Sequence, residues 1–326
     1  MMRPKKGIAI AIAVGLAVVG AGSASASASS GQTMSVFAEP QAGITPVLQL
    51  IGEAHKSIDL TMYELTDQQV ESALVAAEKR GVEVRVLLNH KDPFETSSPN
   101  ASAFSYLVEH GVQVRYAPSY LSLTHQKTLT IDNATSAILT LNLAGDYSST
   151  RDFGVIDSQP ADVASIVQTF DADWASKHTS PSSGTGDLVW SPGAAAAVMN
   201  LIQNAQKSID LENEEMDYRT ATSALCSAAH RGVDVKVVMT YDSEWSSAFR
   251  ELDACGAHVH VFHGQAYYIH AKVLIVDGST ALVGSQNLST ESLDYNRELG
   301  ITLKSPTLVG QLSGWFDSDY TKAEAY

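Results

Sequence analysis

Residues 270–287, HAKVLIVDGSTALVGSQN, place an imidazole and an ammonium close together beside an apolar run. The run at 273–276 is short and rich in β-branched residues, and the Asp-Gly pair after it predicts a strand that ends in a tight turn. His270 and Lys272 are two residues apart, so on a strand their side chains leave the same face of the sheet. Such a pair suits the binding of a phosphate. The polar candidates in the stretch are His270, Lys272, Asp277, Ser285 and Asn287.

The same spacing, HxKxxxxD, occurs once more, earlier in the chain. It consists of His125, Lys127 and Asp132, and Asn142 stands where the later copy has Asn287. Two copies of so specific a pattern predict one shared site rather than two ordinary structural histidines.

The sequence contains an internal repeat, so that its second half resembles its first. KSIDL occurs at 56–60 and at 207–211, and RGVEVRVLLN at 80–89 matches RGVDVKVVMT at 231–240. Such internal similarity indicates two fused copies of one unit. Between them, 178–187 is rich in Ser, Gly, Pro and Thr without an apolar period, which is typical of a linker. We therefore expect one half at 29–182 and the other at 183–326.

Each half alternates between helical and strand patterns. In the first half we expect a helix over 46–56, a strand over 58–63, a second helix capped by Thr66 and Gln69, and a strand over 82–88. This alternation with short linkers predicts an α/β fold with a mixed, mostly parallel sheet that helices cover on both faces.

These motifs resemble the phospholipase D superfamily, whose signature is HxKxxxxD followed by a GSxN-type turn in each half of the chain. HAKVLIVD with GSQN carries the resemblance in the second half, and THQKTLTID carries it in the first. The resemblance implies two tandem α/β/α sandwich halves, related by a pseudo-twofold axis, whose motifs meet in one cleft.

The resemblance also implies a phosphoric diester hydrolase that needs no metal or other cofactor. One histidine attacks phosphorus and the other protonates the leaving alcohol, while Lys127 and Lys272 neutralise the phosphate oxygens. By the same resemblance we expect His125 to be the nucleophile and His270 the acid. Water or another alcohol then resolves the phosphohistidine.

A nucleophilic imidazole needs a fixed tautomer, so each histidine should have a carboxylate on its second ring nitrogen. Asp152 and Glu298, in the matched strings RDFGV and RELGI, resemble the family's orienting acids. Asp132 and Asp277 belong to the signature but end their strands, and we expect them to brace the site.

One departure from the family pattern lies in the first half, where Leu139 and Thr140 replace the usual Gly-Ser pair. Thr140 keeps a hydroxyl. Leu139 implies a different backbone approach, which would narrow the pocket or weaken a phosphate contact. Asn142, Ser285 and Asn287 are the residues expected to bind the phosphate.

The first 28 residues have the order of a signal peptide: basic residues, a short apolar run and a small-residue stretch. We expect cleavage and secretion to the extracellular space; an uncleaved anchor is the alternative. In an oxidising compartment Cys226 and Cys255 are expected to form a disulfide, and two separate buried thiols are the other interpretation.

The chain is acidic. Its formal charge is −15, and removal of three basic and no acidic side chains with the leader gives −18. This charge disfavours binding to long nucleic acids. The leading hypothesis is a secreted, monomeric phosphodiesterase that cleaves or transfers phospholipid headgroups during transient membrane-surface contact. An extracellular nuclease or other phosphodiesterase is the runner-up, and a non-catalytic phosphate- or membrane-binding protein is the third reading.

Two further groups of residues, an acidic run and three tyrosines, allow both a functional and a structural interpretation. The acidic run at 212–215 offers oxygen ligands but lacks the spacing of a known calcium loop, so no metal site is expected there. Tyr120, Tyr267 and Tyr268 precede the two motifs and either line a pocket or pack in the core.

Overall fold

The computed structural model describes residues 33–90, 98–145, 147–264 and 267–326, which form one compact unit. The expected signal peptide, 1–28, lies outside the described residues. Within the described ranges no helix is long and apolar enough to cross a membrane.

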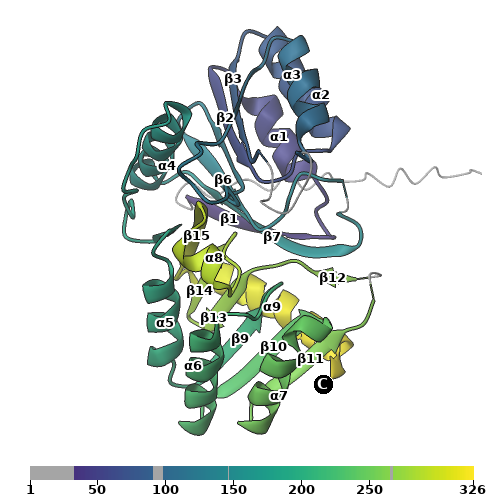
Figure 1. The fold of residues 1–326 in the computed structure, drawn as a ribbon, viewed down its shortest axis with the longest axis vertical. Helices are drawn as coiled ribbons and strands as arrows, with labels where there is room; N and C mark the ends of the chain where they lie inside the picture. The colour runs from purple at the N-terminus through teal and green to yellow at the C-terminus, as the bar shows by residue number, and fades with distance from the viewer. Residues whose placement is uncertain (1–32, 91–97, 146, 265–266) are drawn as a thin grey trace, which may run out of the picture. The chain divides into compact units, whose positions relative to one another are not determined.

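The first half is a mixed sheet with helices on its faces (Figure 1). Its strand order is β1-β7-β6-β5-β2-β3-β4. The strands are β1 (Met34–Glu39), β2 (Ser57–Met62), β3 (Glu83–Leu88), β4 (Gln113–Tyr116), β5 (Thr128–Ile131), β6 (Thr135–Leu139) and β7 (Thr150–Asp157). The helices are α1 (Thr45–Glu53), α2 (Gln68–Lys79), α3 (Ala101–Glu109) and α4 (Pro160–Trp174).

The second half repeats this arrangement, with strand order β16-β11-β10-β9-β13-β14-β15-β8. Its strands are β8 (Leu188–Ser191), β9 (Ser208–Glu212), β10 (Asp234–Thr240), β11 (His258–Phe262), β12 (Tyr268–Ile269), β13 (Val273–Val276), β14 (Thr280–Gly284), β15 (Glu298–Leu303) and β16 (Glu324–Ala325). Its helices are α5 (Ala195–Asn204), α6 (Arg219–His230), the short 3₁₀ helix η1 (Ser243–Trp245), α7 (Ser246–Ala254), α8 (Thr290–Asp294) and α9 (Pro306–Lys322).

The expectation of mostly parallel sheets was wrong. Along the two strand orders given above, β2, β3 and β4 are parallel to one another, and so are β9, β10 and β11. All the other neighbouring strands in these two orders are antiparallel. The reason is local: crossover helices join the parallel strands, whereas the motif-bearing strands β5 and β13 turn back immediately into β6 and β14. The hairpin predicted at 273–283 is therefore present, with Leu274 opposite Leu282.

The start of α2 also differs from the expectation. Asp67, not Thr66, is the N-cap residue, and its carboxylate accepts hydrogen bonds from the backbone N–H groups of Gln69 (2.7 Å) and Val70 (3.1 Å). An aspartate caps as well as a threonine and adds a favourable charge at the helix N-terminus.

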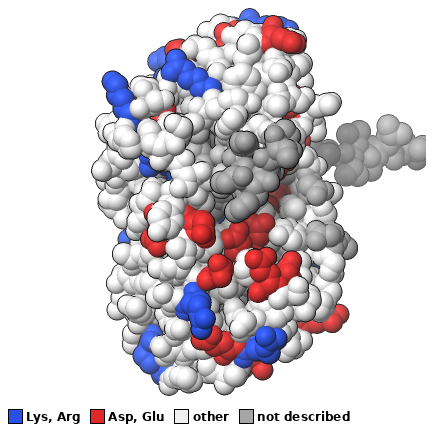
Figure 2. All heavy atoms as spheres, viewed as in Figure 1, with Lys and Arg blue, Asp and Glu red and all other residues white. Residues whose placement is uncertain are grey.

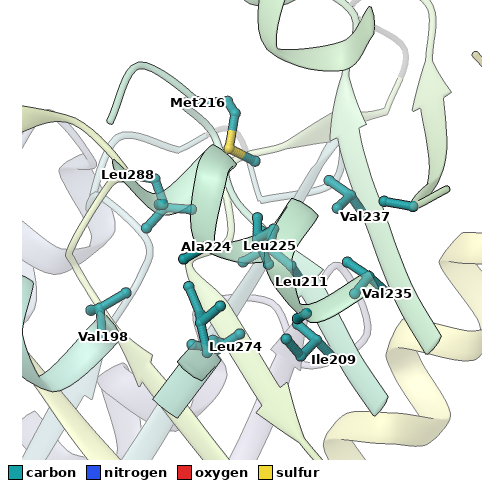
Figure 3. Packing of buried hydrophobic residues seen from close by; sticks show 14 of the residues in the cluster. Val198, Ile209, Leu211, Met216, Ala224, Leu225, Val235, Val237, Leu274 and Leu288 are labelled. Atoms are coloured by element: carbon teal, nitrogen blue, oxygen red, sulfur yellow. The ribbon is translucent and has the colours of Figure 1, made fainter. Parts of the chain in front are cut away.

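Helices α5 and α6 cover one face of the second sheet. Ile209 and Leu211 of β9 and Leu274 of β13 pack against Val198 of α5 and Leu225 of α6 (Figure 3). A matching core in the first half contains side chains of α1, α2 and α3.

A third apolar core joins the two halves. It contains Ile138 and Phe153 from the first sheet together with Val283 and Leu299 from the second, and residues of α9 pack against it. The short strand β12 also crosses over and pairs in parallel with β7 of the first half, with Ile269 opposite Arg151. The shared core and this strand pairing hold the two sheets against one another.

Cys226 of α6 and Cys255, at the C-cap of α7, form a disulfide, with their Cα atoms 5.4 Å apart. The bridge ties together two helices that follow one another along the chain.

Candidate active site

Each motif places its histidine and lysine just before a buried strand. His125 and Lys127 precede β5, and His270 and Lys272 precede β13. All four side chains are largely shielded from solvent, with Lys127 only 1% and Lys272 only 3% exposed. Each ammonium donates a hydrogen bond to the carbonyl of the histidine two residues earlier. The two-residue spacing thus ties each ammonium to the main chain of the histidine in its own motif.

The orienting carboxylates are exchanged between the halves. His125 Nδ1 lies 3.0 Å from Glu298 Oε2, and His270 Nδ1 lies 2.9 Å from Asp152 Oδ1. Each acid therefore fixes the imidazole of the opposite half and leaves the other ring nitrogen, Nε2, for chemistry. The spacing of the two acids along the sequence could not distinguish this pairing from one within each half.

Main-chain hydrogen bonds reinforce the exchange. The N–H groups of His125 (3.0 Å) and Gln126 (2.8 Å) donate to the carbonyl of Arg297, and the N–H of His270 donates to the carbonyl of Arg151 (3.1 Å). Both arginines directly precede an orienting acid in the sequence. Their carbonyl groups connect the strand that carries the orienting acid of one half to the motif histidine of the other half.

The guanidinium groups of these arginines also reach across the interface. Arg297 forms a buried two-point ion pair with Asp173 of α4, with N–O distances of 2.9 Å, and Arg151 does the same with Asp319 of α9. Tyr120 donates to Asp173 (2.9 Å) and Tyr267 to Asp319 (3.1 Å). Asp173 and Asp319 were missed as site supports, although FDADW at 170–174 in the first half matches FDSDY at 316–320 in the second.

Hydroxyl groups position the two acids. Thr140 donates to Asp152 (2.5 Å) and Ser292 donates to Glu298 (2.7 Å). Ser285 is a predicted phosphate-binding residue, and the structure shows which groups its side chain contacts. Its side chain is fully buried and its hydroxyl accepts from the N–H of Leu299 (3.1 Å). Ser285 therefore braces the strand that carries Glu298.

The Leu139 substitution leaves the backbone unchanged. Leu139 N–H donates to the Lys127 carbonyl (3.0 Å) just as Gly284 N–H donates to the Lys272 carbonyl (3.2 Å). The Leu139 side chain lies in the apolar core of the first half, away from the cavity. The expectation that it alters the backbone approach and narrows the pocket was therefore wrong.

Asp132 and Asp277 brace the motif strands from outside the site. Asp132 accepts from the N–H groups of His55, Lys56 and Ser57 at 2.6–3.1 Å, and Asp277 makes the equivalent bonds in the second half. Burial alone would raise the pKa of each carboxyl, but these hydrogen bonds outweigh it and lower the pKa. Neither acid lines a cavity at the histidines.

Burial and neighbouring charges act differently on the residues of the first motif. Burial lowers the pKa of His125 below its usual 6.5, although Glu298 opposes the shift. Burial, followed by the charge of Lys272, lowers the pKa of Lys127 to about 7. Because Lys272 acts on both groups, the two motifs share one electrostatic environment.

A cavity of about 490 Å³ opens beside His125, and a smaller one of about 90 Å³ opens beside His270. Asn287 and Ser292 line the larger cavity, whereas Asn142 and Tyr147 line the smaller one. The side-chain oxygens of both asparagines are buried and have no partner among the described residues. A bound polar ligand would satisfy them.

The larger cavity is strongly acidic. Figure 2 shows Asp and Glu side chains gathered near the middle of the molecular face that is turned toward the viewer. The acidic residues that line the cavity are Glu215, Asp217, Glu244, Glu291 and Glu298.

Sequence reasoning missed the role of Glu214, in the acidic run after β9. Its carboxylate lies 2.8 Å from Lys272 Nζ and 3.5 Å from His270 Nε2. Tyr268 also donates to it (3.1 Å). No group of metal-ligating side chains occurs in the described ranges, and Glu214 is engaged by an ammonium instead. The repeat offered one signal, because the equivalent residue of the first half is the neutral Tyr63.

Comparisons with known proteins show that the chain is similar to bacterial cardiolipin synthases. Cardiolipin synthase A of Pectobacterium carotovorum subsp. carotovorum (strain PC1) is 24% identical over 330 residues, which cover 83% of this chain and 65% of that protein. Cardiolipin synthase A of Proteus mirabilis (strain HI4320) is 22% identical and covers 87% of this chain. The chain thus spans about two thirds of the length of these relatives, 65% and 68%.

Two solved structures share the fold. The phosphatidylserine synthase of Haemophilus influenzae Rd KW20 has a TM-score of 0.70 at 12% identity and covers 90% of this chain and 87% of its own. A polyphosphate kinase from Porphyromonas gingivalis has a TM-score of 0.67 at 16% identity, with 87% of this chain and 46% of that chain covered.

The family profile described as "Cardiolipin synthase, PLD-like domain" matches residues 47–174 and again 198–320, which together make up most of the sequence. These two matched segments contain the two HxKxxxxD motifs, one in each sheet. The chain therefore belongs to this PLD-like domain family, within the phospholipase D superfamily.

Proposed function

We propose that this protein is a phosphodiesterase or phosphatidyltransferase that acts on phospholipid headgroups through a phosphohistidine intermediate. One observation carries the proposal: two imidazoles are held by carboxylates of the opposite halves, at 3.0 and 2.9 Å, beside two buried ammonium groups. Nucleophile, acid and oxyanion stabilisers are thus available in one site.

Electrostatics favour His125 as the nucleophile. Burial lowers the pKa of His125, which favours the neutral imidazole, and Glu298 holds Nδ1, so the lone pair on Nε2 can attack phosphorus. His270 has a carboxylate beside each ring nitrogen, Asp152 at 2.9 Å from Nδ1 and Glu214 at 3.5 Å from Nε2, and we assign it the role of the acid.

The proposed steps balance as follows. His125 Nε2 forms a bond to phosphorus while the bond to the leaving alcohol breaks, and that alcohol oxygen takes a proton from His270. A water or a second alcohol then gives its proton to His270 and attacks phosphorus, which frees His125. Lys127 and Lys272 stabilise the charge on the nonbridging oxygens in both steps.

The acidic cavity supports a lipid headgroup over a nucleic acid. A polynucleotide would bring neighbouring phosphates close to Glu215, Asp217 and Glu244, where like charges repel. A phospholipid such as phosphatidylglycerol or phosphatidylcholine has a single phosphodiester, and its polar headgroup fits a cavity of about 490 Å³. The names of the relatives, cardiolipin synthase and phosphatidylserine synthase, also point to headgroup exchange.

The test compares substrates side by side in the presence of a chelator. Vesicles of phosphatidylcholine or phosphatidylglycerol, with and without added glycerol, and fluorescent single-stranded DNA are incubated with wild type, His125→Ala and His270→Ala. We expect lipid turnover that both substitutions abolish. Cleavage of DNA alone would favour a nuclease, and turnover of no phosphodiester would favour a binding protein. Free headgroup separates hydrolysis from transfer to glycerol.

We further propose that the chain works outside the reducing cytosol. The Cys226–Cys255 disulfide supports this location, because such bridges persist mainly in oxidising compartments. Fractionation of the producing cells, with thiol labelling of each fraction, tests it. Reduced protein confined to the cytosol would contradict the proposal.

A further inference from the structure

Glu214 stands where a phosphate of the second half would be expected to bind. Its carboxylate contacts Lys272 Nζ (2.8 Å), Asn287 Nδ2 (3.4 Å) and His270 Nε2 (3.5 Å). All three belong to the second-motif side chains that the sequence assigns to chemistry or phosphate binding. A carboxylate from the protein itself thus sits on the anion-binding groups of one half.

The first half has no such carboxylate. Three residues beyond each KSIDL copy, the first half has Tyr63 and the second has Glu214. The Tyr63 ring lies 5.2 Å from Lys127 Nζ and packs edge-on against His125, with the ring centroids 4.7 Å apart. Tyr63 therefore contacts the same two motif residues without adding a charge.

This difference sets the charge of the site. Lys272 has three N–H donors, and Glu214 and the His270 carbonyl take two of them, which leaves one for a ligand within the described part of the site. The positive charge of Lys272 is already balanced by Glu214. Lys127 has no carboxylate within hydrogen-bonding distance among the described residues.

We propose that Glu214 determines which phosphates the site accepts: its fixed negative charge admits singly charged phosphodiesters and rejects doubly charged phosphomonoesters. This inference rests on the proposed function, because it describes the substrate class of the same site. The repulsion from Glu214 is proportional to the charge of the ligand, so the doubly charged ligand suffers twice the free-energy penalty. A product that ends in a phosphomonoester would accordingly bind weakly.

The experiment uses two ligands that differ by one methyl group and one charge. At pH 7.5 dimethyl phosphate is a monoanion, and methyl phosphate is mostly a dianion because its second pKa is about 6. Their dissociation constants are obtained from the ligand dependence of the thermal unfolding temperature of the full chain, which requires no turnover.

Glu214→Gln should tighten the binding of dimethyl phosphate by roughly tenfold and that of methyl phosphate by about a hundredfold, since the removed repulsion scales with ligand charge. Glu214→Tyr reproduces the residue of the first half and should also shift the selectivity toward methyl phosphate. This second variant keeps the test decisive if the glutamine variant folds poorly.

Asp234→Asn is the matched control. It removes one negative charge at the opposite end of the same parallel strands, where Asp234 is about half exposed and paired with Lys236. Both dissociation constants should stay as in wild type.

Equal changes for the two ligands in the Glu214 variants, or weaker binding of both, would overturn the inference and leave Glu214 as a support for Lys272. Failure of wild type and both Glu214 variants to bind either ligand would overturn the proposed function as well. The two failures are therefore distinguishable.

Discussion

The proposed mechanism requires a neutral His125 and a charged Lys127, so the two residues limit activity at opposite ends of the pH range. His125 has to be neutral to attack, so activity falls as the pH drops through its pKa, which burial places below 6.5. Lys127 has to be charged to neutralise the phosphate, so activity falls as the pH rises through about 7. The two residues lie in the same motif. The acidic limb set by His125 and the alkaline limb set by Lys127 enclose a narrow pH optimum of activity.

We predict that kcat/KM of the wild type follows a bell with its alkaline limb near pH 7, the pKa of Lys127. Lys127→Arg should move that limb upward by more than one unit, because a guanidinium stays charged throughout this range. The measurement is the pH profile of kcat/KM with a soluble phosphodiester.

Lys272→Arg serves as the control, because Lys272 already has Glu214 as its counterion. Its alkaline limb should coincide with that of the wild type. An unmoved limb in Lys127→Arg would assign the limb to another group, and the position of the limb, not its height, is the deciding quantity.

At the scale of the elements, the two motif hairpins reach the same backbone geometry by different packing. In the second half, a Cβ on Gly284 would lie 2.3 Å from the Cα of Gly300 and 2.5 Å from Gln286 Oε1. In the first half Leu139 pairs with Gly154, and its side chain fills the core. The Gly of the family motif is thus a packing requirement here, set by the neighbouring strand.

Two substitutions should therefore both destabilise the fold, for opposite reasons. Leu139→Ala leaves a cavity and should cost about 2–5 kcal/mol. Gly284→Ala forces a methyl group against backbone and should cost roughly 1–3 kcal/mol or more. Urea unfolding at neutral pH measures both values.

Val108→Ala, on an exposed face of α3, should change stability by less than about 0.5 kcal/mol. If Gly284→Ala unfolded at the wild-type urea concentration, the close approach of β14 and β15 would be contradicted. A rise in kcat for Leu139→Ala would restore the view that Leu139 restricts the pocket.

At the scale of the whole molecule, the active site exists only because the halves exchange acids. Asp152 of β7 serves His270, and Glu298 of β15 serves His125. The Arg151–Asp319 and Arg297–Asp173 ion pairs and the shared apolar core hold the strands in these positions. Loss of either acid should therefore disable the histidine of the opposite motif.

We predict that Asp152→Asn behaves like His270→Ala and that Glu298→Gln behaves like His125→Ala. On a diester with an alkyl leaving group all four variants should lose about 10²–10⁴-fold in rate. A p-nitrophenolate departs without a proton, so on that substrate Asp152→Asn and His270→Ala should recover most of the loss, while the other two variants stay slow. Steady-state rates on the two diesters provide the measurement.

The opposite pattern, with Glu298→Gln rescued by the nitrophenyl substrate, would mean that each acid serves its own half or that the roles of the histidines are reversed. The single variants of the histidines separate these cases, because His125→Ala is rescued only if the roles are reversed.

The sequence alone determined the two copies, the two HxKxxxxD motifs, the α/β class and the family. These properties depend on spacing along one strand, where residues two apart share a face, and on similarity between the copies. The same reasoning identified Asp152 and Glu298 as orienting acids and Cys226 and Cys255 as a candidate pair.

Only the tertiary structure decided which acid meets which histidine, because a pairing within halves and a pairing across halves obey the same symmetry. It also decided the antiparallel character of the sheets, the bracing role of Ser285 and the position of Glu214 on Lys272. These contacts join residues far apart in the sequence. They follow from how the two sheets pack against each other, which no local pattern records.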